Sequence, residues 1–201
     1  MKLYIIITVN SSVAKIIAGN YNEIDKLEFV GMSNMEIRVA KSSDIEKIAE
    51  VYVKNHRETY RELLSDDYFE SLTLDYAKEK WSTYLKSAGS KMWVAYNADI
   101  FLGFAAGTED KNLADTWYLD SLHITENARG KGVGTSLIKI MMMYAVENGY
   151  SKMSVCIIKG NDNAGSLYEK LGAKHLLDFE DDFCGTVSHS EKLLWDNLLV
   201  N

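Results

Sequence analysis

The interpretation of this chain begins at residues 129–135, which read RGKGVGT. Three glycines within five residues allow the backbone to approach a ligand closely. Residues 135–148 follow with an apolar stripe at helical spacing, so a helix is predicted directly after the loop. The unbonded N–H groups and the dipole of its first turn favour an anion, and Arg129 and Lys131 add positive charge. The loop is therefore predicted to bind a pyrophosphate.

Two common nucleotide-binding motifs fail on this loop. A P-loop ends in Gly-Lys-Ser/Thr, whereas Lys131 is followed by Gly132. A dinucleotide fingerprint ends in Gly or Ala, but that position holds Thr135 when counted from Gly130 and Leu137 when counted from Gly132. Two interpretations of the loop remain, a phosphate site of another class and a flexible surface loop with basic residues.

Apolar periodicity on both sides of the loop predicts alternating strands and helices. The order is one strand, two helices, three strands, a helix, a strand, a helix and two strands, which indicates a central mixed sheet with helices on its faces. The predicted strands cover residues 35–40, 91–96, 100–107, 117–124, 153–158, 175–179 and 187–195.

The helices are predicted from capping residues as well as from spacing. Ser42-Ser43-Asp44 precedes a first helix, and Gly149 and Gly172 are placed to end the last two. The remaining helices are expected over 66–85, 135–148 and 161–171. The expected buried anchors of the second helix are Tyr68, Phe69, Leu72, Tyr76 and Trp81.

The first 34 residues differ from the rest of the chain. Leu3–Val9 and Val13–Ala18 are strand-like runs with polar residues between them, which predicts a hairpin. A signal peptide begins similarly, but this apolar run is short and no cleavage-like site follows closely. We expect an extension over 1–34, either extra strands or sequence before a natural start at Met35, and one domain over 35–201.

Composition excludes several classes of function. A net charge of -7 disfavours nucleic acid as the main partner. No stretch approaches the ~20 apolar residues of a membrane span. Cys156 and Cys184 form no C-x-x-C pair and have no histidine at metal-ligand spacing, so no metal site is predicted. A reducing compartment, the cytoplasm, is expected.

Three motifs in order resemble the GNAT superfamily of N-acetyltransferases. Arg129-x-x-Gly132-x-Gly134 matches its Arg/Gln-x-x-Gly-x-Gly/Ala signature, and residues 122–124 have its apolar-x-apolar strand pattern. Residues 161–172, NDNAGSLYEKLG, resemble its second motif, Asn-x-x-Ala-x-x-Leu-Tyr-x-Lys-x-Gly. The resemblance covers about residues 35–195. It implies an α/β (α+β) fold with a mixed, mostly antiparallel sheet of about seven strands, helices on both faces, and acetyl-CoA as co-substrate.

The resemblance also implies roles for individual residues. The loop backbone would hold the pyrophosphate of coenzyme A, and Asn161 would bond the cofactor. Tyr168 matches the family's general acid, which protonates the departing thiolate. Glu126 departs from the pattern, since many relatives have proline there. The implied cofactor-binding residues are Leu122, His123, Ile124, Arg129, Gly130, Lys131, Gly132, Val133, Gly134, Thr135, Asn161 and Tyr168.

The general base is less clearly marked. Many relatives place a glutamate on the cofactor strand where this chain has Tyr118. Asp120 lies two residues further on the same strand face and is the candidate base, acting directly or through water. His123 is expected on the opposite face unless a bulge intervenes. His56 and Glu58 are alternative residues of the acceptor pocket.

Residues 56–61 and Trp81 resemble a bacterial GNAT group whose substrates are mostly unassigned. The predicted activity is transfer of an acetyl group from acetyl-CoA to a small-molecule amine or peptide amine. The alternative is a non-catalytic acyl-CoA sensor with the same fold, which the tyrosine at position 168 disfavours. Relatives are often dimers, so a homodimer is the assembly that the resemblance implies.

Overall fold

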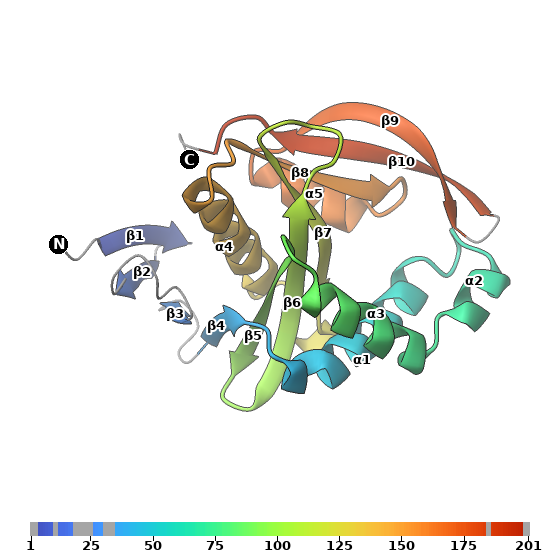
Figure 1. Ribbon diagram of the computed structural model, residues 1–201, viewed down its shortest axis with the longest axis horizontal. Helices are drawn as coiled ribbons and strands as arrows, with labels where there is room; N and C mark the ends of the chain where they lie inside the picture. Colours follow the sequence, from blue (N-terminus) through green and yellow to red (C-terminus); the bar gives the residue numbers. More distant parts are fainter. Residues whose placement is uncertain (1–3, 10–11, 18–25, 30–34, 184–185, 199–201) are drawn as a thin grey trace.

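A mixed β-sheet forms the centre of the molecule (Figure 1). The computed structural model describes residues 4–9, 12–17, 26–29, 35–183 and 186–198. The strand order is β3-β4-β5-β6-β7-β8-β10-β9, and only the β7–β8 pair is parallel. The strands are β3 (Lys26–Phe29), β4 (Met35–Val39), β5 (Lys91–Asn97), β6 (Ile100–Glu109), β7 (Thr116–Ile124), β8 (Lys152–Ile158), β9 (Lys174–Phe183) and β10 (Thr186–Trp195).

The seven strands from β4 to β10 confirm the predicted mostly antiparallel sheet. In addition, β3 pairs with β4 at the sheet edge. The predicted N-terminal hairpin is present as a separate two-stranded sheet, in which β1 (Tyr4–Val9) pairs with β2 (Ser12–Ile17). Cys184 lies outside the described residues.

Helices pack on both faces of the sheet, as predicted. On one face, α4 and α5 cover a core that includes Trp117, Leu119 and Leu137. On the other, α1, α2 and α3 cover a core that includes Ile48, Trp81 and Phe104. Figure 1 shows α4 and the α1–α3 group on opposite sides of the central strands. The helices are α1 (Ile45–Thr59), α2 (Asp66–Ser71), α3 (Leu74–Lys86), α4 (Val133–Glu147) and α5 (Asp162–Lys170).

The region predicted as one helix over 66–85 is two helices, because the chain breaks at Leu72 and Thr73. Thr73 is extended and caps α3 by accepting a hydrogen bond at 3.1 Å from the N–H of Tyr76. The break also corrects the prediction for Tyr76, whose side chain is 50% exposed, whereas Trp81 is fully buried as expected. Both helices of the GNAT-like motifs end as predicted, at left-handed Gly149 and Gly172.

Strand β7 changes neighbours along its length. Its first part pairs with β8 from Thr116 to Leu119, and this parallel pairing then stops. Beyond it β7 bonds only β6, while the end of β8 bonds only β10. The two parallel strands therefore diverge, and no strand of the described residues pairs with this edge of β7 from Asp120 to Ile124. Within the described residues, no helix is long and apolar enough to cross a membrane.

Candidate active site

The divergence of β7 and β8 opens a cavity of about 420 Å³. Its walls come from α1, α2 and α3 on one side and from α5 and the β9–β10 hairpin on the other. The unpaired edge of β7 forms part of its lining, and residues 120–123 lie along it. A strand edge of this kind offers N–H and C=O groups to an extended ligand rich in amides.

The glycine loop leads into the N-terminus of α4. Gly130 and Gly132 have φ of 72° and 85°, a left-handed conformation that favours glycine. The first helical bond runs from the N–H of Ser136 to the carbonyl of Gly132 at 3.0 Å. The N–H groups of Val133, Gly134 and Thr135 therefore have no carbonyl of the helix to bind. The helix begins two residues earlier than predicted, which places these three groups in its first turn.

Gly134 in this turn faces the gap between β7 and α5. A β-carbon there would lie 3.4 Å from Leu167, 3.7 Å from Ile124 and 3.8 Å from Leu122. By contrast, a β-carbon on Gly132 would meet no atom within 4 Å. The loop thus presents its backbone to open space, and the exposed Lys131 follows directly on Gly130. This arrangement can hold a pyrophosphate through N–H groups and the helix dipole.

Arg129 is turned toward α1. One guanidinium nitrogen donates to Asn55 at 2.9 Å and to Glu58 at 3.0 Å, and Nε donates to the carbonyl of Ile124 at 3.4 Å. Asn55 also donates to the carbonyl of Ile124 at 3.0 Å, so these contacts fix the end of β7 against α1. Glu58 pairs with Arg129 and does not line the cavity, whereas His56 does.

Tyr168 lies at the α5 side of the cavity and is 5% exposed. Its ring packs edge-on against Trp195, with centroids 5.8 Å apart. Among the described residues its hydroxyl makes no hydrogen bond, and burial raises the pKa of this phenol. A neutral O–H that faces a cavity without a protein partner can donate a proton to a ligand.

Asn161 precedes α5 and lines the same cavity as Tyr168. Its backbone carbonyl accepts bonds from Ala164 and Gly165 at 3.1 and 3.2 Å. Its side-chain amide donates to the hydroxyl of Tyr60 at 3.2 Å. The amide lines the cavity, so its carbonyl oxygen and second N–H are suited to a ligand.

A β-bulge lies at Asp120. Ala106 of β6 pairs with Ser121 and Gly107 pairs with Leu119, so Asp120 is the extra residue of β7. Because the bulge adds one residue to the alternation, His123 lies on the same face as Asp120. The expectation that His123 faces away applies to a strand without a bulge, and the bulge at Asp120 is the exception that it named. Its ring lies 5.2 Å from Phe104 and Tyr52 and 5.3 Å from His56.

Burial keeps the two histidines neutral. It lowers the pKa of His56 to about 3, and it lowers the pKa of His123 well below the usual value. The nearby ammonium of Lys80 acts in the same direction on both rings. His56 is further held by a 2.8 Å hydrogen bond between Nδ1 and the hydroxyl of Tyr68. Burial raises the pKa of Asp120 above its usual value, with Lys80 and Ser121 acting against it.

Lys80 on α3 lines the same cavity and was not expected from the sequence. Its ammonium donates to the hydroxyl of Tyr52 at 2.9 Å. It lies 4.6 Å from the ring centre of Tyr52 and 5.0 Å from that of Trp81. The exposed Tyr76, one helical turn away, also lines the cavity. Helical spacing places Lys80 and Tyr76 on one face of α3, but only the tertiary packing shows that this face lines the cavity.

Tyr118 and Cys156 line the cavity near a buried ion pair. Tyr118 lies beside Cys156, and burial raises the pKa of both groups. Lys192 forms an ion pair with Asp110 and lies 5.7 Å from the ring centre of Tyr118. The residue at the family's frequent glutamate position is thus a neutral phenol held in place by its neighbours.

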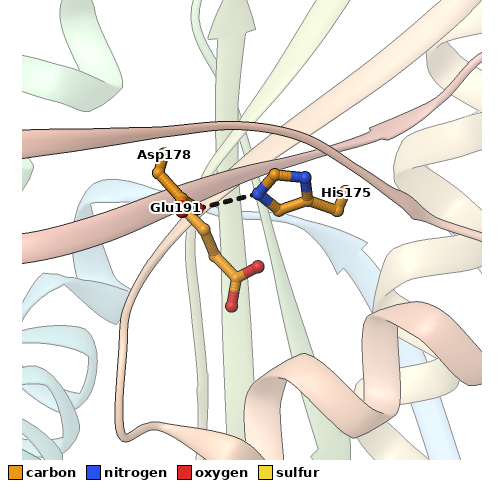
Figure 2. A group of neighbouring side chains, drawn as sticks. All are labelled: His175, Asp178 and Glu191. Atoms are coloured by element: carbon orange, nitrogen blue, oxygen red, sulfur yellow. Dashed lines mark hydrogen bonds and ion pairs between the residues drawn. The ribbon is translucent and has the colours of Figure 1, made fainter.

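A separate titratable cluster lies on the β9–β10 surface. Figure 2 shows His175, Asp178 and Glu191, whose candidate ligand atoms lie within 4.8 Å of one another. His175 bonds Asp178 at 2.8 Å, and Lys159 pairs with the same carboxylate at 2.7 Å. An ammonium therefore already supplies the cation that Asp178 requires, and the cluster is a surface ion-pair network.

The unpaired strand edge, the glycine loop and the first turn of α4 together fit coenzyme A. The strand edge suits the amides of its pantetheine arm, and the loop suits its pyrophosphate. Such a fold and site define an acyl-CoA-dependent transferase. The chain belongs to the acetyltransferase (GNAT) family, whose sequence model matches residues 38–173, more than half of it. Membership of this family makes the chain an acetyltransferase by class, and solved structures with this fold include complexes with coenzyme A and with acetyl-CoA.

Individual relatives agree with this assignment. The uncharacterized N-acetyltransferase YuaI of Bacillus subtilis is 26% identical over 81% of this chain and 93% of its own length. The N-acetylaspartate synthetase of Xenopus tropicalis is 31% identical over 53% of this chain, and the match spans only 39% of that protein. The coenzyme A complex of PaiA N-acetyltransferase from Thermoplasma acidophilum has the same fold. Its TM-score is 0.63 at 22% identity, covering 78% of this chain and 97% of that one.

Proposed function

We propose that the protein acetylates an amine by direct attack on acetyl-CoA, with Asp120 as general base and Tyr168 as general acid. Asp120 removes a proton from the substrate ammonium, directly or through water. The free amine attacks the thioester carbonyl, so that an N–C bond forms, the C–S bond breaks and the nitrogen releases its surplus proton to water. Tyr168 gives its proton to the departing sulfur and recovers one from solvent.

The observation that carries this proposal is the position of Tyr168. Its buried phenol faces the cavity where β7 and β8 diverge, and it has no hydrogen-bond partner among the described residues. Asp120 lines the same cavity from the bulge of β7. Burial raises the pKa of that carboxyl, which brings it nearer to the pH at which a base must work. The two groups thus lie on different walls of one cavity, as the acid and base of a single transfer require.

The test is Tyr168→Phe, which removes the hydroxyl and keeps the ring against Trp195. We expect kcat to fall about 100-fold or more, the usual scale of acid catalysis, with acetyl-CoA affinity within about twofold. Turnover is followed as free thiol release with a panel of amines, and affinity by calorimetry. Tyr144→Phe, a tyrosine on α4 outside the cavity, is the matched control. Full activity of Tyr168→Phe would assign the acid role to water or to another side chain.

A further inference from the structure

Lys80 has no place in the transfer step, yet it lines the cavity between Tyr52 and Tyr76. Its ammonium is directed by the 2.9 Å bond to the Tyr52 hydroxyl and by the rings of Tyr52 and Trp81. No carboxylate in the described part of the chain forms an ion pair with it. On the same helix, Lys78 pairs with Glu46 at 2.9 Å. Lys80 is therefore a half-buried cation without an ion-pair partner among the described residues.

An ammonium partly removed from water is costly unless an anion accompanies it. His56 and His123 are neutral and the hydroxyl of Tyr52 is uncharged, so these neighbours of Lys80 supply none. Asp120 is near enough for Lys80 to affect its pKa, but the two side chains form no ion pair. The cavity thus presents a separated positive and negative charge, an arrangement complementary to a ligand that carries both.

The anion that fits is a carboxylate. Lys80 supplies one positive charge, which balances the single negative charge of a carboxylate but not that of a dianion. Asp120, Asp181 and Asp182 also line the cavity, and their charges would oppose a dianion. Asp181 and Asp182 are exposed at the hairpin and favour the approach of an ammonium group rather than binding the anion.

We propose that the acceptor is an amine that also carries a carboxylate, an amino-acid-type zwitterion. Its carboxylate binds the ammonium of Lys80, while its amine lies beside Asp120 and is acetylated. This inference rests on the proposed function and adds the substrate class. A diamine or polyamine, which the acidic hairpin alone would favour, is the competing class.

The first experiment compares amines that differ only in the carboxylate. L-Lysine, L-lysinamide and cadaverine form one series, and 4-aminobutyrate and butylamine form another. With the wild-type protein, we expect kcat/KM for the acids to exceed that for the members without a carboxylate by about 10-fold or more, the scale of a hydrogen bond to a charged group. A preference for cadaverine and butylamine over the acids would overturn the proposal while leaving acetyl transfer intact.

The second experiment uses Lys80→Met, which keeps an apolar stem against Tyr52 and Trp81 and removes the charge. We expect KM for the acids to rise about 10- to 100-fold, with kcat changed less than about threefold and the amide and diamine unaffected. Lys78→Met on the same helix is the control and should match the wild type. Equal effects of Lys80→Met on acids and amides would show a structural role and overturn the inference.

Binding is measured separately from turnover, so that the two proposals fail in different ways. Calorimetry titrates 4-aminobutyrate and butylamine into wild type and Lys80→Met saturated with coenzyme A. Tighter binding of the acid, lost in Lys80→Met, supports the carboxylate site whether or not acetylation occurs. Equal binding of the two ligands to the wild type overturns it. Absence of thiol release with every amine, despite such binding, would count against the proposed transfer alone.

Discussion

The surface proposed for the cofactor, called the cofactor end below, and the part of the cavity proposed for the acceptor, called the acceptor end, share strand β7 but are built in different ways. At the cofactor end the groups are mostly backbone N–H and C=O, presented by left-handed glycines, the first turn of α4 and an unpaired strand edge. At the acceptor end they are side chains from α1, α2, α3, β7 and the β9–β10 hairpin. Backbone groups are constrained by local sequence, whereas the side-chain cluster depends on how distant elements pack. The cofactor end therefore depends little on which side chains are present, whereas side-chain changes at the acceptor end would alter which acceptor is bound.

The largest expected effect is at the cofactor end, where Gly132→Glu places a carboxylate beside the first turn of α4. Repulsion and the loss of two or more hydrogen bonds to a charged phosphate should weaken acetyl-CoA binding at least ~100-fold. Calorimetry measures the affinity, and circular dichroism checks the fold. Gly149→Glu is the control, because it has the same left-handed conformation at the opposite end of the helix, with φ of 87° against 85°. Equal affinities of the two variants would exclude the loop as the pyrophosphate site.

A smaller effect, dependent on pH, is expected at the acceptor end for Asp120→Asn. Burial raises the pKa of Asp120, so the wild-type kcat/KM should increase as pH rises through a value above the ordinary ~3.9 of aspartate. The variant should lose roughly 100-fold at about pH 7, and less at about pH 10, where more of the amine is already deprotonated. The variant should also lack the rise of kcat/KM with pH that the ionisation of Asp120 produces in the wild type.

The control for this prediction is Asp99→Asn, at the exposed turn between β5 and β6. Its pH profile should match that of the wild type. If Asp120→Asn retained this rise of kcat/KM with pH, another group would be the base, and the side-chain account of this end would have to be revised. Acetyl-CoA affinity should remain within about twofold in both variants, because its contacts are assigned to the backbone.

The two ends also differ in how far the sequence could predict them. The loop, the helix that follows it and the glycines that end both motif helices are local features, and each was predicted within a few residues. The bulge at Asp120 depends on the pairing of β6 with β7, so the face of His123 could not be fixed from the alternation of one strand.

Lys80 illustrates the same limit at the acceptor end. Its position on α3 depends on the helix break at Thr73, whose capping role competes with continuous helical periodicity. Within an uninterrupted helix over 66–85, Tyr76 is expected among the buried residues, but it is half exposed at the cavity. The sequence does contain a signal for the break, because Thr73 is an N-cap residue type that precedes a charged helical stretch. Such a signal marks the start of a helix and does not identify a ligand site.

The smallest effect is expected for removal of residues 1–34, which should leave both ends of the cavity unchanged. The residues assigned to the two ends lie from Tyr52 onward, and β4 is expected to keep its pairing with β5 when β3 is removed. We therefore propose that residues 35–201 form a self-sufficient domain. Acetyl-CoA affinity and kcat should stay within about twofold of the full chain, while the midpoint of thermal unfolding falls by about 5 °C, since one short edge strand is removed.

Removal of residues 1–25 alone, which retains β3, is the matched comparison and should restore that midpoint. If the shorter chain were insoluble or failed to bind acetyl-CoA while the longer one was normal, β3 would belong to the core of the domain. Loss of acceptor turnover with normal acetyl-CoA binding would show instead that only the acceptor end depends on the sheet edge, because the geometry of the acceptor end is set by packing between distant elements.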